Sequence, residues 1–313
     1  MQQDKNFTPD HPGPDESRAE FRLEVFSRYR GLLFSIAYRM LGSVADAEDL
    51  LQEAYIRWQR AEVAEIRSTR AFLVTVVSRL CINHLESMRV RREEYVGQWL
   101  PEPVVTAPGS DPYALLQVDE SLSMAFLVLL ERLTPVERAV FLLREVFDCD
   151  YADIARTLGK EEANCRQILR RAHDHVAGMR PRFEVSAEKR EQLLVEFTQA
   201  TATGNLAGLI TLLTADAVLH SDGGGKGPAV PNLVHGADRV ARALLGSMHK
   251  LVPRDLATRL AEINGQPGIV SYRQGQPYAV VTLDIVEDRI RSVYIISNPE
   301  KLAHLPKLPD APC

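Results

Sequence analysis

The chain has 313 residues, of which 45% are hydrophobic and 25% are charged, and its formal net charge is -5. This length and composition predict a folded chain of about two or three domains and exclude one dominated by disorder. The charge excludes a protein coated with positive charge. Any nucleic-acid contact must therefore come from a local basic face.

Targeting and redox signals are sparse. No stretch reaches the length of a membrane-spanning helix, and the first twenty residues lack the basic-then-apolar pattern of a secretory signal, so we expect a cytoplasmic protein. Cys81, Cys149, Cys165 and Cys313 are far apart without a C-x-x-C pair. This spacing predicts reduced, mostly buried thiols, and nothing indicates a metal or cofactor.

The first predicted element follows a tail. Residues 1–19 are rich in Asp and Pro, which predicts disorder, with order beginning near Phe21. Apolar residues then recur at three- and four-residue steps, and this helical pattern ends at Gly42.

Two further helices complete a predicted helical domain over 20–96. Ser43, with Asp46 three residues later, resembles a capping box and predicts a helix start. The next helix is expected over 68–90, where apolar residues form one stripe and basic and polar residues form the other face.

A linker and a second helical domain are predicted next. The segment 97–114 is rich in proline, which disfavours a helix and predicts an interdomain linker. The second domain is expected over 115–182. Within it, Thr134 precedes a proline and stands three residues before Glu137, which predicts a helix running to about Phe147.

The strongest motif begins at Asp150. An apolar helical face ends at Gly159, which permits a sharp turn, and a second apolar stripe follows, so the pattern predicts a helix-turn-helix. The exposed face of the second helix carries amide and guanidinium groups that suit a major groove. The alternative is an ordinary helical hairpin with a solvated basic face. The predicted DNA-reading residues are Asn164, Arg166, Gln167, Arg170 and Arg171.

The pattern changes after about residue 186. Two helical stretches separated by Gly204 and Asn205 precede a short strand and a glycine-rich loop. A helix over 237–251 interrupts several short strands. The segment 187–313 is therefore expected to be an α+β domain with a curved antiparallel sheet. The predicted strands are 217–221, 256–263, 269–272, 278–285 and 290–296.

Two helical faces in the first domain carry charge. Asp46, Asp49 and Glu53 form an acidic stripe that could contact a basic protein surface or serve only the helix dipole. Arginines on the helix over 68–90 could follow a phosphate backbone, although exposed basic helices are common.

The motifs resemble those of bacterial sigma-70-type factors of the extracytoplasmic-function group. The resemblance is carried by 46–54, by 70–89 and by 133–171, and it covers nearly all of 20–180. It implies a sigma factor of a stress response that binds core RNA polymerase and promoter DNA, while catalysis belongs to the polymerase.

The resemblance assigns region 2 to 20–96 and region 4 to 115–182. Core-polymerase binding is implied for Asp46, Asp49, Leu50, Leu51, Gln52 and Glu53. Minus-ten recognition is implied for Arg70, Arg79, Asn83 and Arg89, and minus-thirty-five recognition for the exposed face of the helix-turn-helix. The first turn of that recognition helix departs from the usual family pattern, because it begins with Glu161 and Glu162.

The chain is similar to a sigma-J-like subgroup with a SnoaL-like C-terminal extension. This likeness implies that the extension at 187–313 contacts the other domains and regulates them. The implied regulatory residues are Trp99, Pro101, Asp222, Gly223, Gly224, Gly225, Lys226, Asn298, Pro299, Glu300, Lys301 and Leu302. The glycine-rich loop lacks the pattern of a phosphate loop and could instead be a flexible surface turn.

A different function stays open at this stage. SnoaL-like folds include ketosteroid isomerases and polyketide cyclases, so the chain could be an isomerase, a cyclase or a ligand-sensing DNA-binding repressor with accessory helices. The sequence does not show that any acid-base candidates converge, and capping is the plainer role for the histidine before Gly236. The candidates are His220, Asp222, His235, Asp238 and Asp284.

Overall fold

The structure is a computed structural model that describes residues 15–62, 66–106, 120–176 and 185–308. Its contacts divide the chain into two compact units, each described separately below. The first unit comprises Met1–Arg89, Leu115–Gln117 and Leu130–Ala177, and the second comprises Val90–Ala114, Val118–Leu129 and Gly178–Cys313. No helix in the described ranges is long and apolar enough to cross a membrane.

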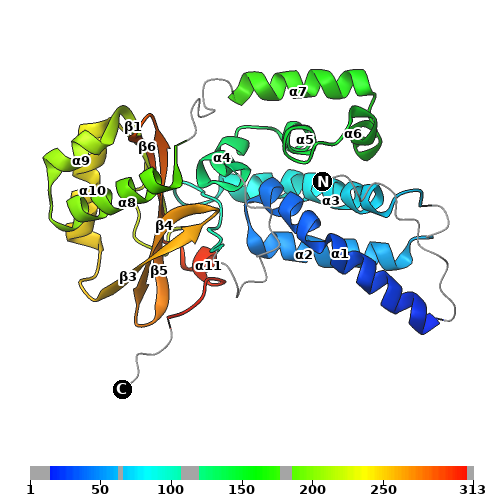
Figure 1. The fold of residues 1–313 in the computed structure, drawn as a ribbon, viewed down its shortest axis with the longest axis horizontal. Coiled ribbons are helices and arrows are strands. Elements are labelled where there is room, and N and C mark those ends of the chain that lie inside the picture. Colours follow the sequence, from blue (N-terminus) through cyan, green and yellow to red (C-terminus); the bar gives the residue numbers. More distant parts are fainter. Residues whose placement is uncertain (1–14, 63–65, 107–119, 177–184, 309–313) are drawn as a thin grey trace. The chain divides into compact units, whose positions relative to one another are not determined.

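The first unit begins with three helices, α1 (Asp15–Leu41), α2 (Val44–Arg60) and α3 (Thr69–Glu93) (Figure 1). The first helix starts six residues before the expected onset of order, and it ends before Gly42, whose φ is 68°. The predicted start of α2 is confirmed, because the Ser43 side chain accepts a hydrogen bond from the Asp46 amide at 3.2 Å. Trp58 is fully buried in the core of this helical group.

The same unit contains a helix-turn-helix. Its elements are α5 (Pro135–Phe141), a π-helical turn η3 (Leu142–Val146), α6 (Tyr151–Leu158) and α7 (Glu162–Val176). Thr134 and Glu137 form the predicted capping box. The C-cap Gly159 takes φ 62° and ψ 39°, a left-handed conformation that glycine adopts without strain.

The last helix of this motif is held on α5 and η3 by apolar packing and two ionisable pairs. His173 lies 3.4 Å from Glu145, and His175 lies 3.3 Å from Glu137. Partial burial opposes ionisation of Glu137, but hydrogen bonds from Thr134 and the nearby His175 lower its pKa below the ordinary value. The ionised carboxylate of Glu137 therefore stabilises both the start of α5 and the packing of α7 against it.

The second unit contains the α+β extension and the segment before the helix-turn-helix. That segment includes a 3-10 turn η2 (Glu120–Leu122) and α4 (Met124–Leu130). The extension contains α8 (Ala187–Ala202), α9 (Leu206–Leu212), β1 (Leu213–Asp222), β2 (Val234–His235), α10 (Ala237–Leu251), β3 (Leu256–Ile263), β4 (Gln266–Arg273), β5 (Gln276–Val286), β6 (Arg289–Ile296) and α11 (Pro299–Leu302).

The six strands lie in the order β2-β1-β6-β5-β4-β3. Strands β3 to β6 form the expected antiparallel meander, which confirms the fold class. The pair β1 and β6 is parallel, with His220 opposite Tyr294, so the expectation of a wholly antiparallel sheet is wrong at this pair. The meander returns β6 beside β1 with both strands running the same way, and no local sequence signal specifies that long-range pairing.

Each face of the sheet has its own apolar core. One face packs against α8, α9 and α10 through residues such as Leu194, Leu244 and Leu283. The other face is covered by the linker, α4 and α11, and its cluster includes Leu100 and Met124. The linker also extends the sheet, because Val105 forms an antiparallel bridge with Ile263 at the edge strand β3. The predicted interdomain linker is thus, over 98–106, part of the packing of the extension.

Candidate functional site

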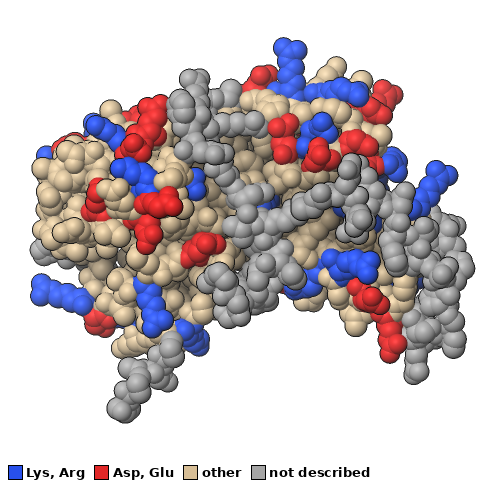
Figure 2. Space-filling model, in the orientation of Figure 1, with Lys and Arg blue, Asp and Glu red and all other residues tan. Residues whose placement is uncertain are grey.

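The predicted DNA-reading face is an exposed surface of α7. Cys165, Ile168, Leu169, Ala172 and Val176 form its buried stripe. The predicted readers lie on the remaining surface, and all are exposed: Asn164, Arg166, Gln167, Arg170 and Arg171. Figure 2 shows basic side chains projecting beside acidic ones along the edge of the view that α7 occupies in Figure 1. Amide and guanidinium groups on one exposed helix face have the donors and acceptors to read base edges.

Arg166 differs from the other predicted readers because it lies on the flank of this face. Its guanidinium donates to the Glu162 carboxylate at 2.9 Å and lies 4.6 Å from the centroid of the Tyr151 ring. Within the described part of the chain, the four other readers have no polar side-chain partner, which leaves their side chains available to a ligand.

The predicted polymerase-binding residues on α2 do not all face outward. Asp49 and Gln52 are exposed, and Glu53 is partly exposed and pairs with Arg57 at 2.8 Å. Leu51 is 2% exposed and packs in the helical core. Asp46 lies 3.5 Å from His84 of α3, and Leu50 is half-buried.

An apolar member of this α2 surface was not predicted. Ile56, one turn beyond Gln52, is 40% exposed. Its position four residues after an exposed polar residue could have revealed it, since residues at that spacing share a helix face.

The predicted minus-ten residues lie on α3. Arg70 and Asn83 are exposed, while the side chain of Arg89 lies outside the described residues. Arg79 is exposed but engaged: its Nε donates to the Thr157 carbonyl at 2.6 Å and its Nη2 to the Arg156 carbonyl at 3.0 Å. These are carbonyls at the C-terminal turn of α6, where the helix dipole attracts a cation.

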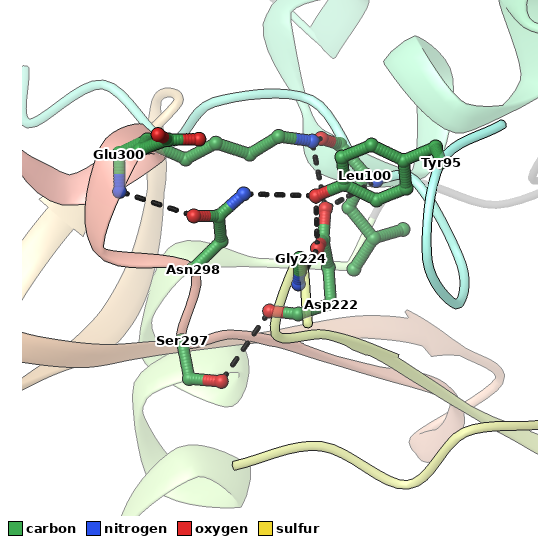
Figure 3. Close-up of polar contacts among 8 residues, drawn as sticks. Tyr95, Leu100, Asp222, Gly224, Ser297, Asn298 and Glu300 are labelled. Atoms are coloured by element: carbon green, nitrogen blue, oxygen red, sulfur yellow. Dashed lines mark hydrogen bonds and ion pairs between the residues drawn. The ribbon is translucent and has the colours of Figure 1, made fainter. Parts of the chain in front are cut away.

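Three of the residues predicted to be regulatory, Gly224, Asn298 and Lys301, contact Asp222, which is fully buried at the end of β1. Its carboxylate accepts hydrogen bonds from the Tyr95 hydroxyl at 2.6 Å, the Leu100 amide at 2.8 Å and the Lys301 ammonium at 2.7 Å (Figure 3). The Gly224 amide donates to it at 3.0 Å. We name Tyr95, Trp99, Leu100, Asp222, Gly224, Asn298 and Lys301 the linker-extension cluster.

Lys301 is the cation of the linker-extension cluster and is 5% exposed. Besides Asp222, its ammonium donates to the Leu100 carbonyl and lies 4.1 Å from the centroid of the Trp99 ring. A buried charge is tolerated only when it is paired and hydrogen-bonded, and both partners of this ion pair meet that condition. The pair therefore ties the linker to both β1 and α11.

Asn298 joins the other side of the cluster. Its side-chain oxygen accepts from the Glu300 amide at 3.0 Å, and its amide nitrogen donates to the Tyr95 hydroxyl at 2.9 Å. Burial and the hydrogen bond to Asp222 raise the pKa of Tyr95, which keeps the phenol protonated as a donor.

The glycine-rich loop approaches this cluster too closely for side chains. A Cβ on Gly224 would collide with Asn298 and Tyr95, and one on Gly227 would collide with the Ser297 carbonyl. The alternative of a free surface turn is therefore wrong at Gly224. Only the end of the loop is exposed, where Lys226 pairs with Glu300.

Tyr95 and Leu100 of this cluster, and the neighbouring Gly227, were not among the predicted regulatory residues. Tyr95 lies in no motif, and no local pattern marks it. Gly227 directly follows the predicted motif, and its position between Lys226 and a proline is a turn signal that could have included it. Pro101, by contrast, was predicted and is buried.

Four of the five acid-base candidates of the extension are engaged in separate contacts, Asp222 among them in the linker-extension cluster. His220 contacts Gln98 at 2.7 Å and stacks on Tyr294, Asp238 pairs with Arg242, and Asp284 pairs with Arg291 at 2.8 Å. Burial raises the pKa of Asp284, although Arg291 opposes that shift. The expected capping role of the histidine before Gly236 is wrong, because Gly236 is the N-cap of α10 and no side chain caps that helix.

Comparison with known proteins identifies both helical regions. The family model described as Sigma-70 region 2 matches residues 25–91, and the model described as Sigma-70, region 4 matches residues 123–175. The first range covers α2 and all but the last two residues of α3, and the second covers all but the last residue of the helix-turn-helix.

Relatives match nearly the whole chain. ECF RNA polymerase sigma factor SigJ of Mycobacterium tuberculosis is 36% identical over 292 residues, which cover 90% of this chain and 93% of the relative. Probable ECF RNA polymerase sigma factor SigI of the same organism is 31% identical over 276 residues, which cover 88% of this chain and 92% of the relative. The crystal structure of Mycobacterium tuberculosis SigJ matches with a TM-score of 0.74 and 33% identity, covering 90% of this chain and 98% of that one. The chain therefore belongs to the extracytoplasmic-function RNA polymerase sigma factors, which direct promoter-specific initiation.

Proposed function

We propose that this sigma factor divides its work among three surfaces, with the exposed face of α2 binding core RNA polymerase, α3 engaging the minus-ten element and α7 reading the minus-thirty-five element. The observation that carries this proposal is the exposed amide and guanidinium face of α7 on a helix-turn-helix. For this division we keep as a proposal the limits predicted from the sequence, with region 2 at 20–96, the linker at 97–114 and region 4 at 115–182.

In vitro transcription tests the proposal as a whole. Full-length protein and core polymerase should produce a promoter-dependent transcript that core polymerase alone does not produce. Absence of any such transcript across a promoter library, with core binding also absent, would contradict the assignment of all three surfaces.

Asp49→Lys should weaken core binding about tenfold, because it reverses a charge on the exposed face of α2 without touching its buried stripe. Fluorescence anisotropy with labelled core polymerase measures the affinity. Glu191→Lys, an exposed acid-to-lysine reversal on α8, is the matched control and should retain it. Equal affinity of the Asp49 variant and the control would remove Asp49 from the interface.

Gln167→Ala and Arg170→Ala should each cost about 1 to 3 kcal/mol in minus-thirty-five recognition, the usual range for one bidentate base contact. Both side chains are exposed on α7, so the helix-turn-helix should stay folded. Footprinting and competition with altered minus-thirty-five sequences measure the loss, and core affinity is the internal control. Discrimination equal to that of the wild type would exclude these two residues as readers.

Minus-ten engagement by Arg79 requires its release from α6, since its guanidinium donates to main-chain carbonyls there. Arg70 and Asn83 are exposed and have no such restraint from the described residues, so we propose that they make the first contact with the minus-ten element.

We infer that the extension acts through the linker and not by catalysis. Four of its five acid-base candidates, His220, Asp222, Asp238 and Asp284, are engaged in separate contacts, and Asp222 holds the linker. Covalent attachment gives a tethered module an effective concentration of roughly millimolar, so weak docking suffices to regulate neighbouring regions.

A further inference from the structure

The helix-turn-helix contains an aromatic ring shared by two arginines. The Arg166 guanidinium lies 4.6 Å from the centroid of the Tyr151 ring, and the Arg144 guanidinium lies 5.3 Å from the same centroid. Both distances are within the range of attraction between a cation and an aromatic face. One ring from α6 therefore joins a guanidinium from η3 to one from the recognition helix.

Each guanidinium is oriented by a second contact. Arg166 donates to Glu162 at 2.9 Å, and Arg144 donates to the Cys149 carbonyl at 3.0 Å. A guanidinium has five N–H donors, so these contacts leave donors unused on both side chains. The side chain of Arg166 is 54% exposed and that of Arg144 is 36% exposed, which keeps those donors accessible.

The location of the ring suits a phosphate contact. Tyr151 is the first residue of α6, and Arg166 lies on the flank of the exposed face of α7. In helix-turn-helix complexes the recognition helix enters the major groove while the first helix crosses the sugar-phosphate backbone. The flank between the two helices is therefore where a phosphate strand passes.

We propose that Tyr151 is a positioning residue that holds Arg144 and Arg166 as phosphate contacts beside the minus-thirty-five reader. This inference rests on the proposed function and extends it to two residues outside the predicted reader set, Arg144 and Tyr151. It also separates Arg166, a backbone contact, from Gln167 and Arg170, which read bases.

Nearby acids orient the arginines without blocking them. Glu162 accepts from one nitrogen of the Arg166 guanidinium. Asp148 lies 3.7 Å from Arg144, but the Asp148 side chain is 98% exposed and can move into solvent. Glu145 faces His173, and the carboxylate of Asp150 accepts from the Asp153 amide as the N-cap of α6. The unused guanidinium donors are thus the groups that a phosphate can reach.

The salt dependence of DNA binding tests this arrangement. Full-length protein is assembled with core polymerase, and binding to promoter DNA is measured over a range of salt concentrations. Arg144→Gln and Arg166→Gln should each reduce the steepness of the log-log salt dependence by about 0.9, the value for one released phosphate contact. Each should weaken matched and altered minus-thirty-five sequences by the same factor, since phosphate contacts carry no base information.

Three variants distinguish a positioning role of the Tyr151 ring from a general role in folding. Tyr151→Phe keeps the ring and should retain wild-type affinity and salt dependence, whereas Tyr151→Leu should lose about as much salt dependence as the two arginine variants. Arg156→Gln is the control. It removes a guanidinium at the other end of α6 that is 70% exposed and paired with Asp153, and it should change neither the affinity nor the salt dependence.

Unchanged salt dependence in both arginine variants would overturn the proposal, as would equal behaviour of Tyr151→Leu and Tyr151→Phe. If Tyr151→Leu merely unfolds, the arginine variants decide the result, because they leave the ring in place. A wild-type complex that fails to protect the minus-thirty-five element contradicts the proposed function itself. Normal protection with unchanged salt dependence contradicts only the role of Tyr151 and its arginines.

Discussion

Lys301→Met is expected to lower the free energy of unfolding of the extension by about 3 to 5 kcal/mol, because it leaves the buried carboxylate of Asp222 without its counter-charge. The substitution keeps a long apolar stem, so the loss reports the ion pair more than the packing. The Leu100 carbonyl loses a donor at the same time.

Urea unfolding, with hydrogen exchange of β5 and β6 to locate the effect, measures this loss. Lys226→Met is the matched control, because its partner Glu300 and Lys226 itself are 69% and 57% exposed and such pairs contribute at most about 1 kcal/mol. Adding Asp222→Leu to Lys301→Met should recover part of the stability by removing the orphaned charge. Equal, small losses in the two lysine variants would show that the buried pair does not hold the extension.

Local chemistry made the helical half of the chain predictable. Ser43 and Thr134 cap helices as expected, because a hydroxyl followed three residues later by a carboxyl satisfies orphan amides at a helix start. Gly159 ends α6 as expected. The exposed face of α7 could also be predicted, since a helix of known period turns its polar residues away from its apolar stripe.

The linker was harder to interpret, because its prolines indicate a spacer while its apolar residues pack. Leu100 and Val104 are fully buried, and the backbone of Val104 accepts from the Asn264 amide at 2.8 Å. Proline lacks an amide donor but does not prevent an extended segment from pairing at a sheet edge. Composition alone could therefore not show that the linker packs on the second face of the sheet.

The linker-extension cluster was predictable as a set of residues and not as a geometry. Resemblance to a subgroup brought Asp222 and Lys301 into one prediction, but only the fold shows them as a buried ion pair. Tyr95 contributes a hydroxyl from outside every motif, and a sequence pattern has no means of marking a partner that lies 127 residues away.

Truncation after Glu184 is expected to release the linker, since the extension supplies the apolar surface that packs against Leu100 of the linker and Met124 of α4. Burial of one such apolar side chain contributes about 1.5 to 3 kcal/mol, which corresponds to a tenfold or larger change in an opening equilibrium. Limited proteolysis within 95–106 should therefore become at least about tenfold faster. Promoter-dependent transcription and core affinity should change in the same protein, because the linker connects the two regions that contact polymerase and DNA.

A shorter deletion identifies the contact responsible. Removing 298–313 deletes Asn298 and Lys301 but keeps the sheet, so it should reproduce the faster linker cleavage if the linker-extension cluster is the restraint. Lys226→Met keeps the cluster and should leave cleavage and transcription unchanged. Wild-type transcription and core binding in both deletions would reject regulation through the linker. Faster cleavage in the longer deletion alone would instead assign the restraint to the apolar cover, because the sheet face that buries Leu100 persists when only the C-terminal segment is lost.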